Sequence, residues 1–579
     1  MTKKLEQASS RLGSELDEYL DACTSAHPPA GGGNKARNLH RSVESEWYRT
    51  ISHQEKLDQA QEAISTVRNY MANRGITGIK DLPLEIITHI FHLVIASQPC
   101  LTHRTTSYEP IIKYPQYPDS LTQICSSWRR IAINSPALWS HIDIALDHSL
   151  NPSLFERANV YAARAGLYPL SIHISNTRSA REHERHSLRQ TVTDPVLYEA
   201  WGDWEDLQEF KFLTDSTRIK SLEVDLYLLD GLRDCHFSML EYFLARCEPG
   251  IFTQYTTRVW ATSRLPPVGG PFIEPANAPR TIKGALLSLP SRHFEAIWLG
   301  VSSLRVNGLC PHWTSKAYHG LVELYLDLGI PKITEAQLVN MLKSSPGLRI
   351  LHINADIFHP SPYGTLIAPV FLSELEELTV IQLWPDDPNN KLQDPSNFVR
   401  WIAPGRKPFK VTSFGNTLEE LPGFCARSNI TQLHVETWVD NTLGDMVRRC
   451  PRLQILILSA FDFGDPELRL ILLPIDTTSS NAQHPVSTTR IDHLYLLDFR
   501  EMQFNDILAT IEQYSVQRLT IWKGGLTYRT DEGMKTSKHA REIRAKLSVI
   551  PPTRCIVEYF PGNVPCPRFG HFDWVSPSY

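Results

Sequence analysis

The sequence predicts an α/β protein in which short N-terminal helices precede a solenoid built from one strand and one helix per repeat. Short apolar hexamers recur at regular intervals through the second half of the chain, and helix-like segments lie between several of them. Two short amphipathic segments come before the first hexamer. Together these patterns indicate small α/β units that bury their apolar faces only by stacking on one another.

The composition is that of an ordinary globular protein. Of 579 residues, 42% are hydrophobic and 21% charged, and the net charge of -5 gives no support for nucleic-acid or anionic-membrane binding. The ten cysteines include no C-x-x-C pair, and no secretory segment or apolar run of about 18 residues occurs. We therefore expect a cytoplasmic and/or nuclear protein with reduced thiols, no cofactor, no metal, and neither nucleic acid nor membrane as a partner.

The first part of the chain contains little that could form a core. Residues 1–45 are polar and include a Pro/Gly-rich patch, which predicts a disordered segment. In residues 46–75, apolar residues from Leu57 to Met71 follow at spacings of 7, 3 and 4, which places them on one face of a helix. This segment is either a short coiled coil or a leader helix that folds back on the next domain.

Residues 76–145 carry the clearest local pattern. The stretch "DLPLEIITHIF" puts Pro83 in the first turn of a helix, where its missing N–H costs nothing, and an apolar stripe runs from Ile87 to Val94. After a Pro/Tyr-rich insertion at 97–120, "LTQICSSWRRIAINSPALW" predicts a second amphipathic helix. Two short helices cannot bury their apolar faces alone, so they need each other and a partner.

From about His141 the pattern changes to hexamers of the form L-x-x-L-x-L, in which L is an apolar residue. Four pairs of successive copies begin 23 to 27 residues apart. The clear copies are "LVELYL" (321), "LRILHI" (348), "LEELTV" (375), "ITQLHV" (430), "LQILIL" (453), "IDHLYL" (491) and "VQRLTI" (516), with weaker ones at 219 and 301. Repeats of about 20–29 residues with this pattern are typical of a leucine-rich-repeat solenoid. We assign residues 146–560 to it and residues 561–579 to a tail that caps it.

The segments between hexamers supply the predicted helices. "TEAQLVNMLKSSPG" and "NTLGDMVRRCP" each place apolar residues on one side and end shortly before a proline. On the strands, residues between the inward apolar positions face the concave surface, because side chains alternate. The candidate substrate-binding residues there are Glu323, Tyr325, Asp327, His352, His434, Glu436, Tyr495 and Trp522. They form either a binding surface or a solvated sheet face.

The two helical segments resemble an F-box, of the type found in fungal F-box proteins with leucine-rich-repeat-like C-terminal regions. The resemblance combines "LPLEII" with C-x-x-W-R-x-I-A and S-P-A-L-W, and the insertion at 97–120 departs from it. The matching positions are Leu82, Pro83, Glu85, Ile86, Ile87, Ile90, Phe91, Ile124, Cys125, Trp128, Leu138 and Trp139. The resemblance implies that these residues dock on the Skp-type adaptor of a cullin–RING ubiquitin ligase and that the repeats bind a substrate protein.

The function expected from this resemblance is that of a non-catalytic substrate-recognition subunit. The sequence has no P-loop, dinucleotide-binding, nucleophile-elbow or zinc-protease motif, so we expect no enzyme activity and no catalytic residues. Two alternatives remain open: a leucine-rich-repeat scaffold without a ligase role, and an enzyme on an unrecognised α/β fold. Phe91 and Trp128 lie on helical stripes, where an aromatic residue is either core or an adaptor contact.

Overall fold

The computed structural model divides the chain into two compact units, Met1–Ile90 and Phe91–Tyr579. The residues that it describes are scattered positions between 7 and 19, then 62–65, 79, 82–97, 118–145, 151–175, 218–228, 234–261, 272–277, 284–327, 330–355, 357–358, 368–381, 395–414, 420–436, 442–459, 490–530 and 533–561. The predictions for 1–45, for the insertion at 97–120 and for the tail at 561–579 therefore lie almost entirely outside the described residues. Of the predicted leader helix at 46–75, only residues 62–65 are described, and they are helical.

Helix α3 (Leu84–Ala96) begins directly after Pro83 and crosses the boundary between the two units. The carbonyl oxygen of Pro83 accepts hydrogen bonds of 3.1 Å from the backbone N–H groups of Ile86 and Ile87. Proline suits this position because the first N–H groups of a helix have no intrahelical partner. The start of this helix agrees with the sequence prediction.

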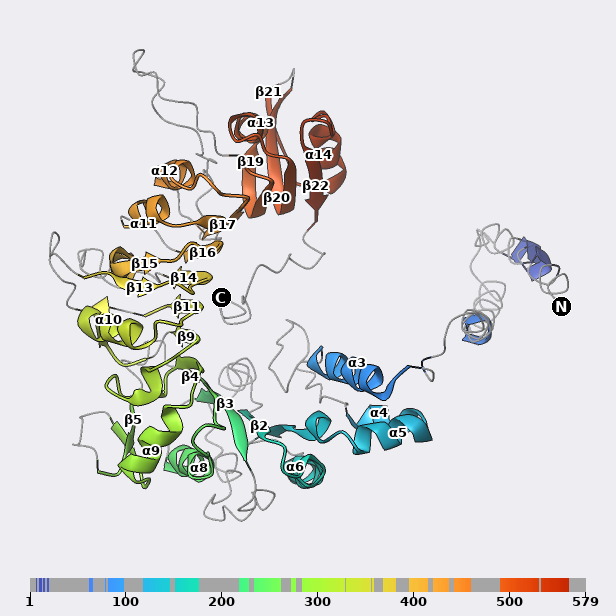
Figure 1. The fold of residues 1–579 in the computed structure, drawn as a ribbon. Helices are drawn as coiled ribbons and strands as arrows, with labels where there is room; N and C mark the ends of the chain where they lie inside the picture. The colour runs from blue at the N-terminus through green and yellow to red at the C-terminus, as the bar shows by residue number, and fades with distance from the viewer. Residues whose placement is uncertain are drawn as a thin grey trace, which may run out of the picture. The chain divides into compact units, whose positions relative to one another are not determined.

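The second unit is built around one sheet of 15 described strands, in which every neighbouring pair except β20–β21 is parallel (Figure 1). In spatial order the strands are β1 (His141–Ala145), β2 (Leu170–Ser175), β3 (Ile219–Leu228), β4 (Gln254–Ala261), β7 (Ser303–Asn307), β9 (Glu323–Leu326), β11 (Ile350–Ile353), β14 (Glu377–Ile381), β16 (Phe409–Phe414), β17 (Ile430–Glu436), β18 (Ile455–Ser459), β19 (His493–Gln503), β20 (Arg518–Thr530) and β21 (Gly533–Ser537). Strand β22 (Ile556–Phe560) also pairs with β20.

Short strands and helices connect the members of this sheet. Three small ladders are formed by β5 (Phe272–Pro275) with β6 (Gly284–Leu287) and β8 (Cys310–Pro311), by β10 (Ile333–Thr334) with β12 (Ile357–Phe358), and by β13 (Val370–Leu372) with β15 (Ile402–Pro404). The helices are α4 (Asp119–Ile124), α5 (Ser126–Ile133), η2 (Pro136–Trp139), α6 (Asn151–Ala165), α8 (Asp234–Leu244), α9 (Ser291–Trp298), η5 (Lys316–Tyr318), α10 (Glu335–Ser344), η7 (Pro395–Trp401), α11 (Leu421–Arg427), α12 (Thr442–Arg448), α13 (Phe504–Gln513) and α14 (Ala540–Leu547). None of the helices in the described residues has the length and apolar character needed to cross a membrane.

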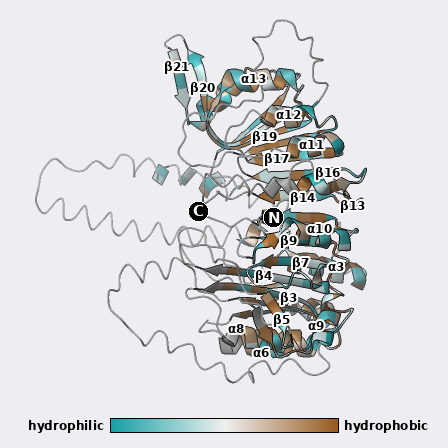
Figure 2. Ribbon diagram, turned by 90° about the vertical axis from the view of Figure 1, so that its left-hand side faces the viewer, coloured by the Kyte–Doolittle hydropathy of each residue, from teal (hydrophilic) through white to brown (hydrophobic). Residues whose placement is uncertain are grey.

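The apolar positions of the hexamers form the core of the sheet. Strand register aligns one buried aliphatic residue from each of nine neighbouring strands, and each is at most 1% exposed. This core row is Leu304, Leu324, Leu351, Leu378, Val411, Leu433, Leu456, Leu494 and Leu519. Brown, hydrophobic segments recur along these strands and the helices beside them in Figure 2, and α9, α10, α11 and α12 line one side of the sheet in Figure 1. Burial of each such side chain contributes about 1.5–3 kcal/mol.

The predicted solenoid with one strand and one helix per repeat is wrong. The hexamers do form neighbouring strands, but the structure is one large, mostly parallel sheet with few helices. Among the described residues, the connection from β11 to β14 contains β12 and β13 and no helix, and that from β14 to β16 contains η7 and β15. Short extended segments such as β13 and β15 pair with each other, which satisfies their backbone groups without a helix.

The predicted separate all-helical N-terminal domain is also wrong. Helix η2 ends at Trp139 and β1 begins at His141, so the chain passes directly from the helices into the first strand of the sheet. Helix α6 packs against both η2 and β1. Its Tyr161 ring lies 5.1 Å from the Trp139 ring, and the Tyr161 hydroxyl donates a 2.8 Å hydrogen bond to the Asp119 carboxylate. These contacts attach α4, α5 and η2 to the end of the sheet.

Candidate functional site: the polar face of the sheet

A continuous row of polar residues crosses the sheet on the face opposite the core row. Each member directly follows a core-facing residue in its strand, and strand register pairs the members one after another from β1 to β22. This polar row is Asp143, His173, Glu223, Thr256, Arg305, Tyr325, His352, Thr379, Thr412, His434, Ile457, Tyr495, Thr520 and Glu558. Only Ile457 lacks a polar side-chain group. We call the side of the sheet that carries this row the polar face.

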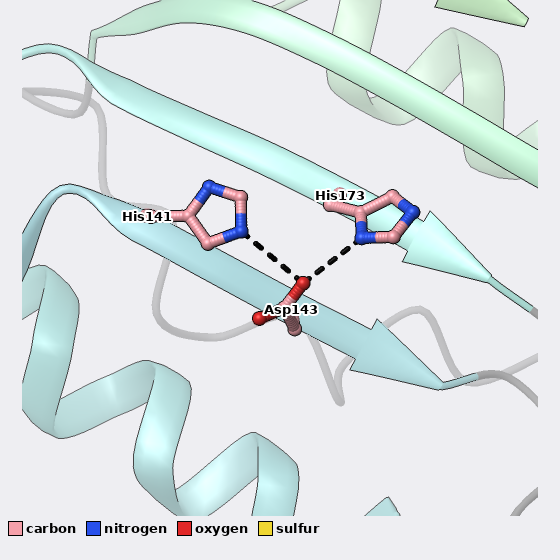
Figure 3. A group of neighbouring side chains, drawn as sticks. All are labelled: His141, Asp143 and His173. Carbon is pink, nitrogen blue, oxygen red and sulfur yellow. Dashed lines mark hydrogen bonds and ion pairs between the residues drawn. The ribbon is translucent and has the colours of Figure 1, made fainter. Parts of the chain in front are cut away.

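At the β1 end of the row, His141, Asp143 and His173 form a compact cluster (Figure 3). The Asp143 Oδ1 atom lies 3.2 Å from His141 Nε2 and 2.9 Å from His173 Nδ1. Burial acts to raise the pKa of Asp143, but the hydrogen bonds and charges of the two histidines hold that pKa well below its usual range. The cluster therefore keeps an ionised carboxylate between two imidazole rings.

The next part of the row contains two arginine–carboxylate pairs. Arg258 Nη1 lies 2.7 Å from Glu223 Oε1, and Arg305 Nη2 lies 2.8 Å from Glu323 Oε2. Burial acts to raise the pKa of Glu223, but the charges of His173 and Arg258 and the Arg258 hydrogen bond lower it. Both pairs join neighbouring strands, so they fix charges of both signs in place on this face.

In the middle of the row, polar groups are buried and packed against one another. The Tyr325 and His352 rings stack with their centroids 5.4 Å apart, and both side chains are buried. Burial and the positive charge of Arg305 lower the pKa of His352 to about 3, so this imidazole is neutral at physiological pH. Next to it, Asn354 Nδ2 donates a 2.5 Å hydrogen bond to the buried Asp327 carboxylate.

Towards the C-terminal strands, histidines on the polar face contact hydroxyl groups. His434 Nε2 lies 2.5 Å from Ser459 Oγ, and burial lowers the pKa of His434 to about 3. His493 Nε2 lies 2.9 Å from Thr520 Oγ1, and its ring stacks on Tyr495 with a centroid distance of 3.8 Å. This end therefore offers neutral hydrogen-bonding and aromatic groups beside an ion pair between Arg518 and Glu558.

The chemistry of this face suits non-covalent recognition. Its ionisable groups hold one another in fixed positions across strands, and neutral histidines, hydroxyls and aromatic rings lie between them. Ordered hydrogen-bonding groups and aromatic rings of this kind are common in protein-binding surfaces. Within the part of the chain that the structure describes, one group of three potential metal ligands stands out: His141, Asp143 and His173, whose ligand atoms all lie within 4.8 Å of one another.

The residues predicted for the concave face belong to strands of this same face. Tyr325, Asp327, His352 and His434 are buried, while Glu323, Tyr495 and Trp522 are half-buried. Glu436 ends strand β17, and its side chain lies outside the described part of the structure. The half-buried residues are the ones that a partner can reach directly, and the buried ones hold the neighbouring side chains in place.

Sequence reasoning missed the polar residues of the first strands, including Asp143, His173, Glu223 and Arg258. The hexamers of β1 and β2 are less obvious than the others, because Trp139 takes the first apolar position of "WSHIDI" and a proline interrupts "LYPLSI". The available signal was the strict alternation of apolar and polar residues in "HIDIA" and "LSIHIS", which is typical of a strand with one polar face.

Helix α3 carries apolar side chains on two different faces. Ile87 and Phe91 are 5% and 0% exposed, and the Phe91 ring lies 4.8 Å from the Trp128 ring of α5. Ile86 and Leu93, which are 46% and 58% exposed, are seven residues apart and therefore lie on one face, two turns apart. Ile90 lies between them on that face and is half-buried. We call Ile86, Ile90 and Leu93 the exposed stripe of α3.

The other residues predicted to contact an adaptor differ in accessibility. Pro83, Glu85 and Ile124 are exposed, and Leu82, Cys125 and Trp128 are half-buried. Leu138 and Trp139 are buried, as are Ile87 and Phe91. In this conformation a partner can reach the exposed residues Pro83, Glu85 and Ile124 and cannot reach the four buried side chains.

Comparison with known proteins assigns no family to this chain. No protein-family model matches it, and no curated protein matches it significantly.

Proposed function

We propose that this chain is the non-catalytic substrate-recognition subunit of an Skp–cullin–F-box ubiquitin ligase. The exposed stripe of α3 binds the Skp-type adaptor, and the polar face of the sheet binds a substrate protein. The resemblance of residues 82–139 to an F-box suggests this class of adaptor. The chain brings a substrate to the ligase and itself catalyses nothing.

The observation that carries the proposal is the exposed stripe of α3. A helix with a single apolar face buries that face against its own protein and presents polar residues to water. Helix α3 buries Ile87 and Phe91 in this way, yet Ile86 and Leu93 stay exposed. Large aliphatic side chains on one rigid face, with few charges among them, are what the centre of a stable protein interface requires.

The polar face supports the second half of the proposal. Parallel strands hold its side chains at fixed spacings, and cross-strand pairs such as Arg305 with Glu323 keep them in one geometry. A surface that is ordered before binding loses little conformational entropy when a partner binds. Recognition of a substrate protein therefore needs no large rearrangement of the sheet.

The test is a binding measurement between the full-length chain and a purified Skp-type adaptor. The double variant Ile86→Asp/Leu93→Asp places two charges on the exposed stripe, and we expect it to weaken adaptor binding about tenfold or more. Phe371→Asp is the matched control, because Phe371 is 72% exposed and lies on β13, away from α3 in the sequence. This control should bind the adaptor like the unmodified chain.

Two outcomes would overturn the proposal in different ways. Unchanged adaptor binding by a folded Ile86→Asp/Leu93→Asp variant would show that the exposed stripe is not the docking surface. If the unmodified chain does not bind the adaptor at all, the ligase role fails, and a binding scaffold without that role becomes the better description.

A further inference from the structure

The cluster at the β1 edge of the sheet has the composition of a metal site. His141 and Asp143 are two residues apart on β1, so strand alternation puts both on the polar face. His173 on β2 is the register partner of Asp143 and lies on the same face. Two imidazole nitrogens and one carboxylate oxygen thus converge from two adjacent strands, as Figure 3 shows.

Two of the three distances within the cluster are close to those of a tetrahedral zinc site, and all three ligand atoms lie within 4.8 Å of one another. Zinc binds imidazole nitrogen and carboxylate oxygen at about 2.0–2.2 Å, which puts neighbouring ligand atoms of a tetrahedron a little over 3 Å apart. The observed separations from Asp143 Oδ1 to the two nitrogens are 3.2 and 2.9 Å. The same atoms can therefore converge on a cation with small adjustments of the rings.

The donor set also selects the class of metal. Imidazole ligands suit zinc and its transition-metal neighbours, whereas magnesium and calcium prefer sites made of oxygen atoms alone. We propose that His141, Asp143 and His173 bind one Zn²⁺ ion that joins the first two strands of the sheet.

The position of the cluster gives this ion a structural role. Strand β1 is the edge of the sheet and directly continues η2, so it is the connection between helices α4, α5 and η2 and the rest of the sheet. A cation held between β1 and β2 cross-links this edge and stabilises the attachment of the helices. This role is independent of the proposed ligase function.

The experiment is a Zn²⁺ titration of the metal-free full-length chain by calorimetry, with Co²⁺ as a spectroscopic probe. His141→Ala removes one ligand atom, and Asp143→Asn replaces the charged carboxylate by a weaker, neutral amide ligand. His319→Ala is the control because His319 is an exposed histidine outside the cluster. We expect the unmodified chain and the control to bind one more equivalent of Zn²⁺ than His141→Ala. Removal of a ligand should weaken this site at least about 100-fold, since removal of a group that merely orients a ligand already costs about 10–100-fold.

Co²⁺ in the unmodified chain should give the visible absorption of a tetrahedral site, and His141→Ala should lose it. The proposal is overturned if the unmodified chain binds no Zn²⁺, or if His141→Ala binds as many equivalents with equal affinity. The cluster is then a hydrogen-bonded group without a metal. His141 is partly exposed, with 36% of its side chain accessible, so His141→Ala decides the outcome even if Asp143→Asn fails to fold.

Discussion

Several polar side chains of the polar face are buried, and their burial affects the stability of the folded chain. An unpaired buried polar group costs about 1–3 kcal/mol, so such side chains persist where a neighbour pairs with them. Asp327 meets this requirement through Asn354, and His434 through Ser459. His352 is instead held neutral, because burial and the charge of Arg305 lower its pKa to about 3.

The pKa of His352 predicts a specific loss of stability in acid. In the unfolded chain this imidazole is protonated below its ordinary pKa of 6.5, whereas in the folded chain it stays neutral down to about pH 3. The unfolded state thus binds a proton that the folded state does not, and the free energy of unfolding falls as the pH falls through this window. We expect His352 to account for a loss of about 2 kcal/mol between pH 7 and pH 5.

Chemical denaturation of the unmodified chain and of His352→Gln at pH 7 and pH 5 measures the loss of stability that His352 causes. Between pH 7 and pH 5, the free energy of unfolding should fall in both proteins. The fall should be about 2 kcal/mol smaller for His352→Gln than for the unmodified chain. The exposed His319→Gln should behave like the unmodified chain. Equal losses in all three proteins would mean that His352 takes up its proton over the same pH range in the folded chain as in the unfolded chain.

We predict that Trp139 stabilises the folded chain as a core residue. It is fully buried, its Nε1 donates a 2.7 Å hydrogen bond to the Ala132 carbonyl oxygen, and the Arg164 guanidinium lies 4.1 Å above its ring. Trp139→Ala should therefore lower the free energy of unfolding by about 3–5 kcal/mol. Thermal melting of the full chain measures this, and a Trp139→Ala protein that keeps its stability but loses adaptor binding would assign Trp139 to the interface instead.

At the scale of elements, helix α10 shows how local sequence and a buried ion pair together fix a helix beside the sheet. Thr334 and Gln337 form a capping box in which each side chain hydrogen-bonds the other residue's backbone N–H group. Glu335, the residue after Thr334, has a side chain that is 1% exposed and accepts a 3.0 Å hydrogen bond from Arg400 of η7. The Trp401 indole N–H donates to the same carboxylate.

Glu335→Ala should destabilise the protein by about 3–5 kcal/mol, because it takes a carboxylate away from a largely buried arginine. Glu376→Ala is the control, since Glu376 pairs with Arg349 and Lys407 on the surface, where ion pairs contribute little. Denaturant midpoints of the two variants provide the comparison. A loss for Glu335→Ala as small as that for Glu376→Ala would contradict a structural role for the buried pair.

The elements that could be predicted from the sequence are those with a local pattern. Hexamers such as those at Leu321 and Leu348 became β9 and β11, and the two helix-like segments became α10 and α12. The connections that hold β13, β15 and η7 could not be predicted, because short extended and 3-10 segments depend on pairing with segments far away in the sequence. The assumption that every repeat contains a helix failed for this reason.

At the scale of the whole molecule, the candidate site exists because strand register aligns polar residues from successive strands. The polar row unites residues as distant in sequence as Asp143 and Glu558, through parallel pairs that no local pattern specifies. Alternation within a strand predicted which residues share a face, and four of the predicted residues, Tyr325, His352, His434 and Tyr495, belong to the polar row. Their burial could not be predicted, because it depends on how neighbouring strands and side chains pack around Tyr325 and His352.

The proposed ligase role of the whole chain depends on α3 being the adaptor-binding surface. Hydrogen–deuterium exchange of the full-length chain, with and without a purified Skp-type adaptor, tests this without any substitution. We predict that the adaptor slows exchange in peptides that cover 84–97 and leaves exchange in the strands from β9 to β18 unchanged. Slower exchange confined to those strands, with none in α3, would contradict the account.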